Sequence, residues 1–222
     1  MSDALWSDVD AMFADALAPE DKDLQATRAA TATAGMPDIA VSTLSGKFLA
    51  IMAQLQGAKS ILEVGTLGGY STLWMARALP ADGRLITLEY DPNHAAVAQA
   101  NLDRAGVADK VEIKVGAALD TLPGLADNPA LPFDLVFIDA DKVNNPVYYK
   151  WAVSYTRPGS LIIIDNVVRR GAVLDAGSED PNIQGIRTLT EQVAGDSRVE
   201  ATVLQTVGSK GYDGIMMIRV KG

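Results

Sequence analysis

Cysteine is absent from this 222-residue chain, and histidine occurs once, as His94. The absence of cysteine excludes disulfides, thiolate metal sites and a thiol nucleophile. A single histidine excludes zinc motifs that need two histidines, and a Ser-His-Asp triad would have to use His94. His94 follows Asp91-Pro92-Asn93 at an expected helix start, which is a poor place for a triad base. We interpret it as a partly exposed residue of a first helical turn.

Long apolar runs and an excess of basic residues are also missing. No unbroken apolar stretch approaches the length needed to span a membrane. Residues 1–8 have neither a basic flank nor an apolar core, so we expect no export signal. The 19 Lys and Arg residues against 28 Asp and Glu give a formal net charge of -9, which disfavours nucleic acid as the main partner. We therefore expect a cytoplasmic protein with no membrane or nucleic-acid partner.

The chain does contain a regular alternation of apolar strands and helical patterns. Hydrophobic residues make up 48% of it, which suits one α/β domain covering residues 1–222. A doubly wound, Rossmann-like, mostly parallel sheet of seven strands is predicted, with helices on both faces and an antiparallel C-terminal strand. The last two strands are joined by residues 208–214, too few for a crossover helix, so an antiparallel hairpin is expected. The predicted strands are residues 61–64, 85–89, 111–115, 133–138, 160–164, 199–207 and 215–220.

Residues 1–35 are predicted to form two helices before this sheet. Apolar residues recur at helical spacing from Leu5 to Leu17, and Pro19 ends the pattern. These helices cannot belong to the sheet, so we expect them to cap the site, to pack against a second subunit in a homodimer, or simply to pack on their own domain. Much later, residues 167–182 lack a clear period and are expected to form a surface loop of the kind that carries specificity.

The stretch from Ile61 to Ser71 is typical of a nucleotide site. A short apolar run breaks into a glycine-rich turn, and the turn leads straight into a helical pattern. Glycines let the backbone approach a ligand closely, although such a turn can also just connect two elements. Leu67 stands where a dinucleotide fingerprint needs its second glycine, so a dehydrogenase is disfavoured. Glu89 ends the next strand, 26 residues after Glu63, where it can bind a ribose rather than only meet solvent.

Three oxygen-bearing side chains end the fourth and fifth predicted strands. Asp139 follows the fourth strand, and Asp165 and Asn166 follow the fifth. Two carboxylates and an amide suit magnesium, manganese or calcium rather than zinc. The alternative is a pair of strand-end caps that bind loop amides. Lys142 comes three residues after Asp139, where it is a candidate general base or else a surface lysine paired with Asp141.

Several short motifs occur together in this chain. They are Leu62-Glu63-Val64-Gly65-Thr66, Gly69-Tyr70-Ser71, Phe137-Ile138-Asp139-Ala140-Asp141-Lys142, Arg157-Pro158-Gly159, Asp165-Asn166-Val167 and Asp213-Gly214. This set resembles the class I S-adenosylmethionine-dependent, cation-dependent O-methyltransferases, the family of catechol and caffeoyl-coenzyme A O-methyltransferases. The resemblance covers nearly all of residues 36–222, and N-terminal helices are typical of the bacterial and plant branch. The motifs are specific together, whereas any one alone is not.

The resemblance implies transfer of a methyl group from S-adenosylmethionine (SAM) to a hydroxyl of a small vicinal dihydroxy aromatic acceptor of the catechol type. It implies that Asp139, Asp165 and Asn166 hold a divalent cation, first of all Mg²⁺ and alternatively Mn²⁺ or Ca²⁺. Lys142 would be the catalytic base, and Glu89 would grip the ribose of SAM. The implied cofactor-binding residues are Val41, Glu63, Gly65, Thr66, Tyr70, Ser71, Glu89, Ala117 and Asp139.

The chain departs from the family pattern at several positions, among them Gly116, Asn145 and Met216. These departures bear on the acceptor more than on the reaction, so a SAM-dependent methyltransferase with another acceptor, such as an amine or a carboxylate, stays open. A non-catalytic module that keeps the cofactor fold would predict degraded metal ligands, and all three ligands are intact. The segment Val168-Arg169-Arg170-Gly171 is the expected specificity element, whose arginines either meet an acidic substrate or are solvated.

Overall fold

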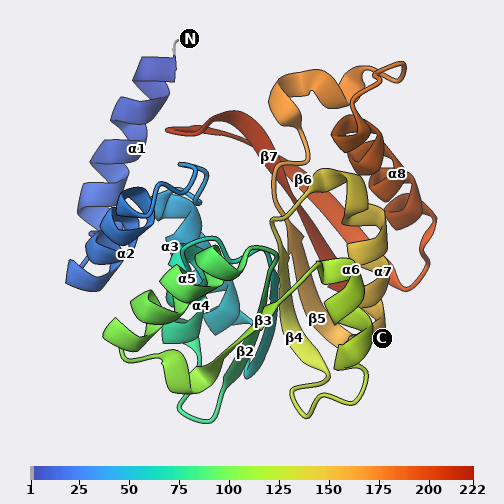
Figure 1. The fold of residues 1–222 in the computed structure, drawn as a ribbon. Helices are drawn as coiled ribbons and strands as arrows, with labels where there is room; N and C mark the ends of the chain where they lie inside the picture. Colours follow the sequence, from blue (N-terminus) through green and yellow to red (C-terminus); the bar gives the residue numbers. More distant parts are fainter. Residues whose placement is uncertain (1–2) are drawn as a thin grey trace.

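The computed structural model describes residues 3–222, which form seven strands surrounded by helices (Figure 1). The N-terminal helices are α1 (Asp3–Leu17), α2 (Lys22–Thr33) and α3 (Thr43–Leu55). The strands are β1 (Ser60–Val64), β2 (Arg84–Glu89), β3 (Val111–Val115), β4 (Phe133–Ile138), β5 (Thr156–Ile164), β6 (Val199–Gly208) and β7 (Gly211–Val220). The remaining α-helices are α4 (Tyr70–Ala78), α5 (Pro92–Arg104), α6 (Ala118–Thr121), α7 (Asn145–Ser154) and α8 (Pro181–Gly195). Short 3₁₀ helices cover Ala108–Lys110, Leu122–Leu125, Lys142–Asn144 and Arg169–Leu174.

The strand order of the sheet is β3-β2-β1-β4-β5-β7-β6. β7 runs antiparallel to both of its neighbours, whereas the pairs from β3 to β5 are parallel. This arrangement confirms the predicted Rossmann-like sheet with an antiparallel C-terminal strand. The chain reverses its direction of strand addition between β1 and β4. In such sheets ligands bind beyond the carboxyl ends of the strands at that reversal.

Both faces of the sheet are covered, which explains why β4 and β5 are apolar at successive positions. Side chains of a strand alternate between the two faces. Leu135 and Phe137 pack with residues of α2 to α5, whereas Val136 and Ile138 pack with residues of α7 and α8. Figure 1 shows the same two layers, with α3, α4 and α5 on one side of the sheet and α6, α7 and α8 on the other. A strand buried on both faces cannot alternate polar and apolar residues.

Two predicted boundaries were wrong. β5 begins at Thr156 rather than at the predicted residue 160, so it includes Arg157-Pro158-Gly159. Its pairing with β4 starts at Phe133 and Thr156 and shifts register before Leu135. The C-terminal hairpin is also longer than predicted. Pairing continues from Val199 and Val220 to Gly208 and Gly211, so that the loop consists of residues 209–210.

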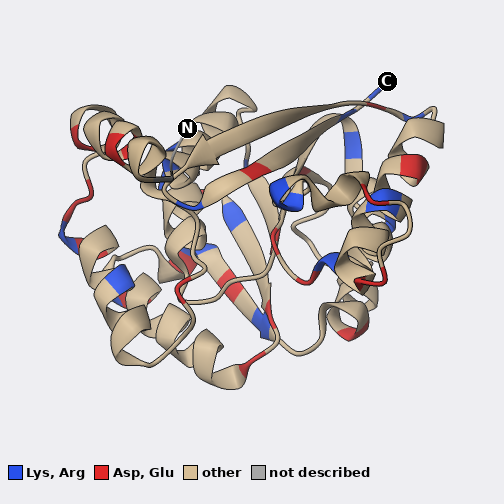
Figure 2. Ribbon diagram, turned by 90° about the horizontal axis from the view of Figure 1, so that it is seen from above, with Lys and Arg blue, Asp and Glu red and all other residues tan. Residues whose placement is uncertain are grey.

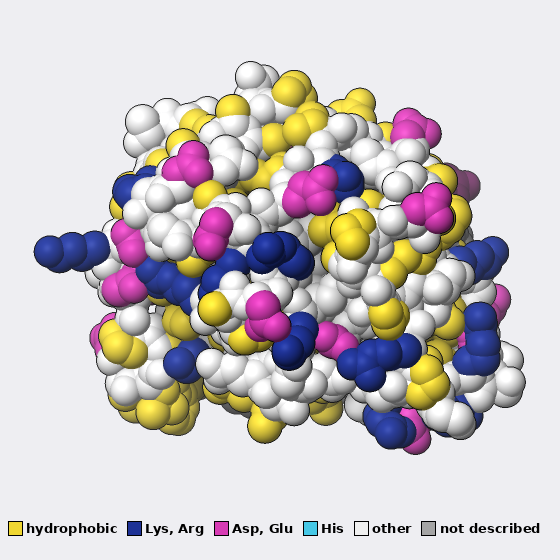
Figure 3. Space-filling model, turned by 90° about the horizontal axis from the view of Figure 1, so that it is seen from below, with side chains coloured by type: hydrophobic (Ala, Val, Ile, Leu, Met, Phe, Trp, Pro, Cys, Tyr) yellow, Lys and Arg dark blue, Asp and Glu magenta, His cyan; other side chains and the backbone are white. Residues whose placement is uncertain are grey.

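Charges of both signs are spread over the surface. Lys and Arg positions lie among Asp and Glu positions in the view from above (Figure 2), and again on the face seen from below (Figure 3). This mixing differs from the continuous basic stripe that a nucleic-acid backbone requires. Within residues 3–222, no helix combines the length and the apolar character that crossing a membrane would require.

Candidate functional site

A cavity of about 970 Å³ lies at the carboxyl ends of β1, β2 and β4, where the strand order reverses. It brings together most of the residues that the sequence predicted for the site. Those in its wall are Val41, Gly65, Thr66, Tyr70, Ser71, Glu89, Ala117, Asp139, Lys142 and Asn166. Glu63 and Asp165 are not part of the wall.

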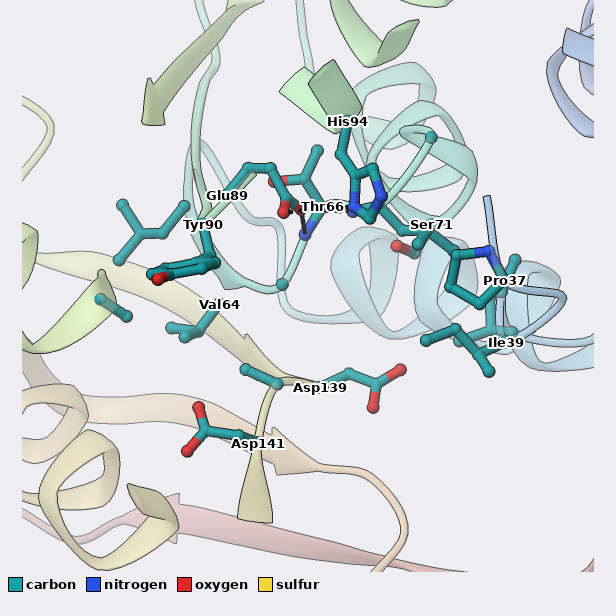
Figure 4. Close-up of a pocket in the computed structure, with 18 of the residues that line it drawn as sticks. Pro37, Ile39, Val64, Thr66, Ser71, Glu89, Tyr90, His94, Asp139 and Asp141 are labelled. Atoms are coloured by element: carbon teal, nitrogen blue, oxygen red, sulfur yellow. Dashed lines mark hydrogen bonds and ion pairs between the residues drawn. The ribbon is translucent and has the colours of Figure 1, made fainter. Parts of the chain in front are cut away.

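The cavity has two ends that differ in chemistry (Figure 4). Glu89, Tyr90 and His94 lie at one end, and Pro37 and Ile39 lie at the other. The carboxylate of Asp139 extends toward Ile39. The first end therefore offers a carboxylate and aromatic rings, and the second offers an acid beside an apolar wall.

Gly65 lets β1 and β4 meet beneath the cavity. Its φ of +104° is rare for residues with a side chain, and an added Cβ would lie 2.3 Å from the carbonyl oxygen of Asp139. The backbone of Asp139 is also tied to β1, because its N–H donates to the carbonyl of Val64 at 2.9 Å. Gly65 thus sets the distance between the glycine turn and Asp139.

Glu89 is buried and oriented by the glycine turn. One carboxylate oxygen accepts hydrogen bonds from the N–H groups of Leu67 at 2.7 Å and Thr66 at 3.3 Å. The other oxygen accepts from the N–H of Asp91 at 3.0 Å, and Nδ1 of His94 lies 3.5 Å away. A carboxylate has about four acceptor positions, so this one still has room for ligand hydroxyls. Glu89 does not simply meet solvent at a sheet edge.

Glu63 lies behind the wall rather than in it. Its side chain is fully buried and accepts hydrogen bonds from the hydroxyls of Ser71 at 2.6 Å, Thr72 at 2.5 Å and Thr87 at 2.7 Å. Burial raises the pKa of Glu63 to about 7, although these three hydroxyls oppose the rise. Ser71 does line the cavity. Glu63 therefore fixes the hydroxyl that Ser71 presents there.

Asp139 and Asp165 directly follow two neighbouring strands of the sheet. Ile138 and Ile164 are directly paired in β4 and β5, and one acid follows each of them. The N–H of Asp165 donates to the carbonyl of Ile138 at 3.0 Å. Burial, and then the neighbouring Asp139, raise the pKa of Asp165 to about 7. Asn166 follows with a left-handed φ of 58°, and its N–H donates to Asp165 Oδ1 at 2.7 Å.

Lys142 is buried and paired with the first of these acids. Its Nζ lies 2.8 Å from Oδ1 of Asp139, so the alternative of a surface lysine paired with Asp141 is wrong. Helix α8 holds the backbone of Lys142 in place. A Cβ at Gly185 in that helix would lie 2.3 Å from the Lys142 carbonyl oxygen. No sequence motif indicates that Gly185 supports the site, because this contact joins segments 43 residues apart.

Comparison with known proteins identifies the family. Residues 14–221 match the O-methyltransferase family. A catechol O-methyltransferase from Niastella koreensis is 52% identical over 221 residues, with all of both chains covered. The chain belongs to the O-methyltransferase family.

Two solved structures agree with this assignment. An O-methyltransferase from Bacillus cereus in complex with S-adenosylhomocysteine is 50% identical with a TM-score of 0.97, covering 99% of this chain and 100% of that one. The O-methyltransferase TomG from Streptomyces achromogenes, involved in tomaymycin synthesis and solved in complex with SAM, is 47% identical with a TM-score of 0.97 and full coverage of both chains. The protein is a SAM-dependent O-methyltransferase.

Helix α2 supplies part of this O-methyltransferase site that sequence reasoning missed. Arg28 donates to Glu20 Oε1 at 2.6 Å and to the carbonyl of Val41 at 3.2 Å. Its guanidinium also lies 3.8 Å from the ring centroid of Tyr70, whose hydroxyl donates to Glu20. Arg28 therefore joins Val41 and Tyr70, two predicted cofactor residues. Its helix shows only scattered charges in sequence, which gave no indication of this role.

A second set of cavity residues that the sequence analysis did not predict follows β4 in the O-methyltransferase. The hydroxyl of Tyr148 donates to Asp141 Oδ1 at 2.6 Å, and the side-chain amide of Asn144 donates to Asp141 Oδ2 at 2.6 Å. All three residues line the cavity. Burial, and then Asp141, raise the pKa of Tyr148, so that the phenol stays a donor. This network fixes the loop that carries Lys142.

Proposed function

We propose that this O-methyltransferase moves the methyl group of SAM to one hydroxyl of a vicinal dihydroxy aromatic acceptor, with a divalent cation in the site. The observation that carries the proposal is the adjacency of Asp139 and Asp165 at the ends of paired strands. Lys142 on Asp139, and Asn166 in the same cavity wall, complete the set. The relative from Niastella koreensis is named a catechol O-methyltransferase, which supports this acceptor class.

SAM would bind with its nucleoside at the Glu89 end of the cavity and its sulfonium near Asp139. Glu89 is held by three backbone N–H groups with acceptor positions left for both ribose hydroxyls. Tyr90 offers a ring at the same end. The other residues proposed to hold SAM are Val41, Gly65, Thr66, Ser71, Ala117 and Asp139 in the wall, with Glu63 and Tyr70 supporting them.

The donor set fits a hard divalent cation, Mg²⁺ first and Mn²⁺ or Ca²⁺ as alternatives. Asp139, Asp165 and Asn166 would supply three oxygens, leaving positions for an acceptor and water. Among residues 3–222, no group of three or more His, Cys, Asp or Glu side chains is placed to hold a metal ion. The amide oxygen of Asn166 is therefore needed as the third ligand. A bound cation would chelate both acceptor hydroxyls and lower their pKa.

The chain's own residues would then orient the acceptor and move one proton. Lys142 Nζ, as a neutral amine, would take the proton from the hydroxyl that reacts and become an ammonium. The resulting oxyanion attacks the methyl carbon of SAM, the carbon–sulfur bond breaks in line, and the products are the methyl ether and S-adenosylhomocysteine. Pro37 and Ile39 would hold the acceptor ring at the apolar end of the cavity. Positioning supplies most of the rate, because no covalent intermediate on the enzyme is required.

The test is methyl transfer from labelled SAM across a panel of catechols, simple phenols, amines and carboxylic acids, each with Mg²⁺ and with EDTA. We expect methyl ethers only from the catechols, and only with the cation present. Equal turnover in EDTA would overturn the metal requirement. Turnover of an amine or a carboxylate alone would favour the alternative acceptor classes, and SAM binding without turnover would favour the non-catalytic module.

A homodimer is the second part of the proposal, and helix α1 supports it. Five large apolar side chains on α1 are between 43% and 65% exposed. They are Leu5, Val9, Met12, Phe13 and Leu17. The edge strand β6 adds exposed Val203, Leu204 and Val207. An apolar stripe beside an exposed sheet edge is typical of a subunit interface. Residues 1–35 would therefore serve both as cap and as dimerisation segment, within a single methyltransferase domain of residues 1–222.

A further inference from the structure

The cavity wall contains one cationic side chain without a carboxylate partner. Among the described residues, the Lys and Arg side chains in the wall are Arg28, Lys142 and Arg169. Arg28 is paired with Glu20, and Lys142 with Asp139. The guanidinium of Arg169 is exposed and makes no hydrogen bond or ion pair within residues 3–222. The cavity therefore contains an available positive charge.

The backbone around Arg169 is held in an unusual conformation. Arg169, Arg170 and Gly171 have φ values of 53°, 54° and 87°, a left-handed run that non-glycine residues rarely adopt. Asp213 holds it, because its Oδ1 accepts from the N–H groups of Val168 at 3.0 Å and Arg169 at 2.9 Å. Backbone in such sparsely populated conformations clusters at active sites and ligand-binding segments. A solvated surface arginine does not require such a conformation.

The place of Arg169 in the chain brings it close to the proposed cation site. Arg169 follows Asn166 by three residues, a span of at most about 11 Å. Both residues line the same cavity. An extended arginine side chain is longer than the distance across an aromatic ring. Its guanidinium can therefore reach the far edge of a ring whose hydroxyls lie near Asn166.

The charges near the cavity make this arginine necessary for one class of acceptor. Asp38, Glu89, Asp139 and Asp141 line the wall, and the whole chain has a formal net charge of -9. A neutral catechol meets no penalty in these surroundings, whereas an anionic one is repelled unless a cation lies beside its charge. We propose that Arg169 binds an anionic substituent of the acceptor, so that the preferred acceptors are dihydroxy aromatic acids. This inference rests on the proposed O-methylation of catechols.

The test compares 3,4-dihydroxybenzoate with uncharged catechol in steady-state kinetics at saturating SAM and Mg²⁺. For Arg169→Gln, we expect the ratio of kcat/KM for the acid to that for catechol to fall about tenfold, mainly through KM. Arg169→Glu should go further and shift preference toward dopamine, a cationic catechol. Calorimetric titration of 3,4-dihydroxybenzoate into the protein loaded with S-adenosylhomocysteine gives the same comparison without turnover.

Arg170→Gln is the matched control, because it removes the same charge one residue away. The guanidinium of Arg170 lies against Gly211 at the hairpin tip and is not part of the cavity wall. We expect it to change the ratio less than about twofold. The inference is overturned if Arg169→Gln leaves the ratio unchanged, or if Arg170→Gln lowers it equally. If the wild-type protein methylates neither compound, the proposed function itself is wrong, and the inference falls with it.

Discussion

Glu63 should make the protein less stable as the pH rises from about 5 to about 8. Its pKa is raised from 4.5 to about 7 in the folded protein, first of all because the side chain is fully buried. Between these values the folded state keeps a proton that the unfolded chain releases. The stabilisation is therefore complete below pH 4.5 and is lost as the pH rises to about 7. The size of the shift corresponds to about 3 kcal/mol in the free energy of unfolding.

The variant Glu63→Gln isolates this contribution, because glutamine keeps the shape and cannot titrate. We expect the free energy of unfolding of the wild type minus that of the variant to fall by about 3 kcal/mol between pH 5 and pH 8. Urea denaturation at several pH values measures it, and the difference cancels other groups, including Asp165. Thr72→Val removes one of the hydroxyls that donate to Glu63, so the loss of stabilisation should move to higher pH. This variant therefore tests the assigned hydrogen bonds. A difference that stays flat would refute the reasoning, since it would mean that the three hydroxyls outweigh burial and keep Glu63 ionised.

Three further predictions concern the turn, the acids and the interface. Gly65→Ala should lower the free energy of unfolding by about 2 to 4 kcal/mol in urea titrations, because the added Cβ meets the backbone of Asp139. Gly57→Ala is the control, since open space surrounds Gly57, and it should lower the free energy of unfolding by only about 1 kcal/mol. Asp165→Ala should reduce kcat by about 100-fold while calorimetry shows nearly unchanged SAM affinity; a loss confined to SAM binding would contradict its role. Met12→Glu on the α1 stripe should convert a dimer into a monomer in light scattering, and a wild-type monomer would exclude the dimer.

The sheet was predictable because its central strands are buried on both faces. β4 has the predicted bounds, since a continuous apolar run of that length has few alternatives. The edge strand β3 also has the predicted bounds, because its apolar residues alternate with polar ones. The C-terminal hairpin was harder. Gly211-Tyr212-Asp213-Gly214 has the composition of a loop, yet pairing with β6 extends the strand through it. Asp213 and Gly214 also serve a tertiary purpose, because an added Cβ at Gly214 would lie 2.5 Å from Val168. Such contacts cannot be predicted from the strand or loop propensity of the residues themselves.

The candidate site was predictable where it depends on strand ends, and unpredictable where it depends on packing between distant segments. Glu89 ends β2, and Asp139 and Asp165 follow β4 and β5. These strands are parallel members of one sheet, so the topology alone places the three acids at one edge. Arg28 reaches Val41 and Tyr70 only after α2 has packed against the glycine turn. Its spacing from these residues follows no motif. The contacts of Arg28 depend on tertiary packing, which cannot be derived from local patterns in a single sequence.

Helices α1 and α2 differ in their surroundings, and the difference assigns the two functions expected of residues 1–35 to different helices. Helix α2 packs onto the glycine turn, where a Cβ at Gly68 would lie 2.0 Å from Thr31 Oγ1, and its Arg28 holds Val41 at the cavity. Helix α1 instead exposes its apolar stripe and meets the hairpin tip, where Asp10 accepts from the N–H of Ser209 at 2.8 Å. We therefore propose that α2 caps the cofactor site and that α1 forms the dimer interface. Because the hairpin tip also contacts Arg170, it supports both the proposed interface and the segment Val168-Arg169-Arg170-Gly171.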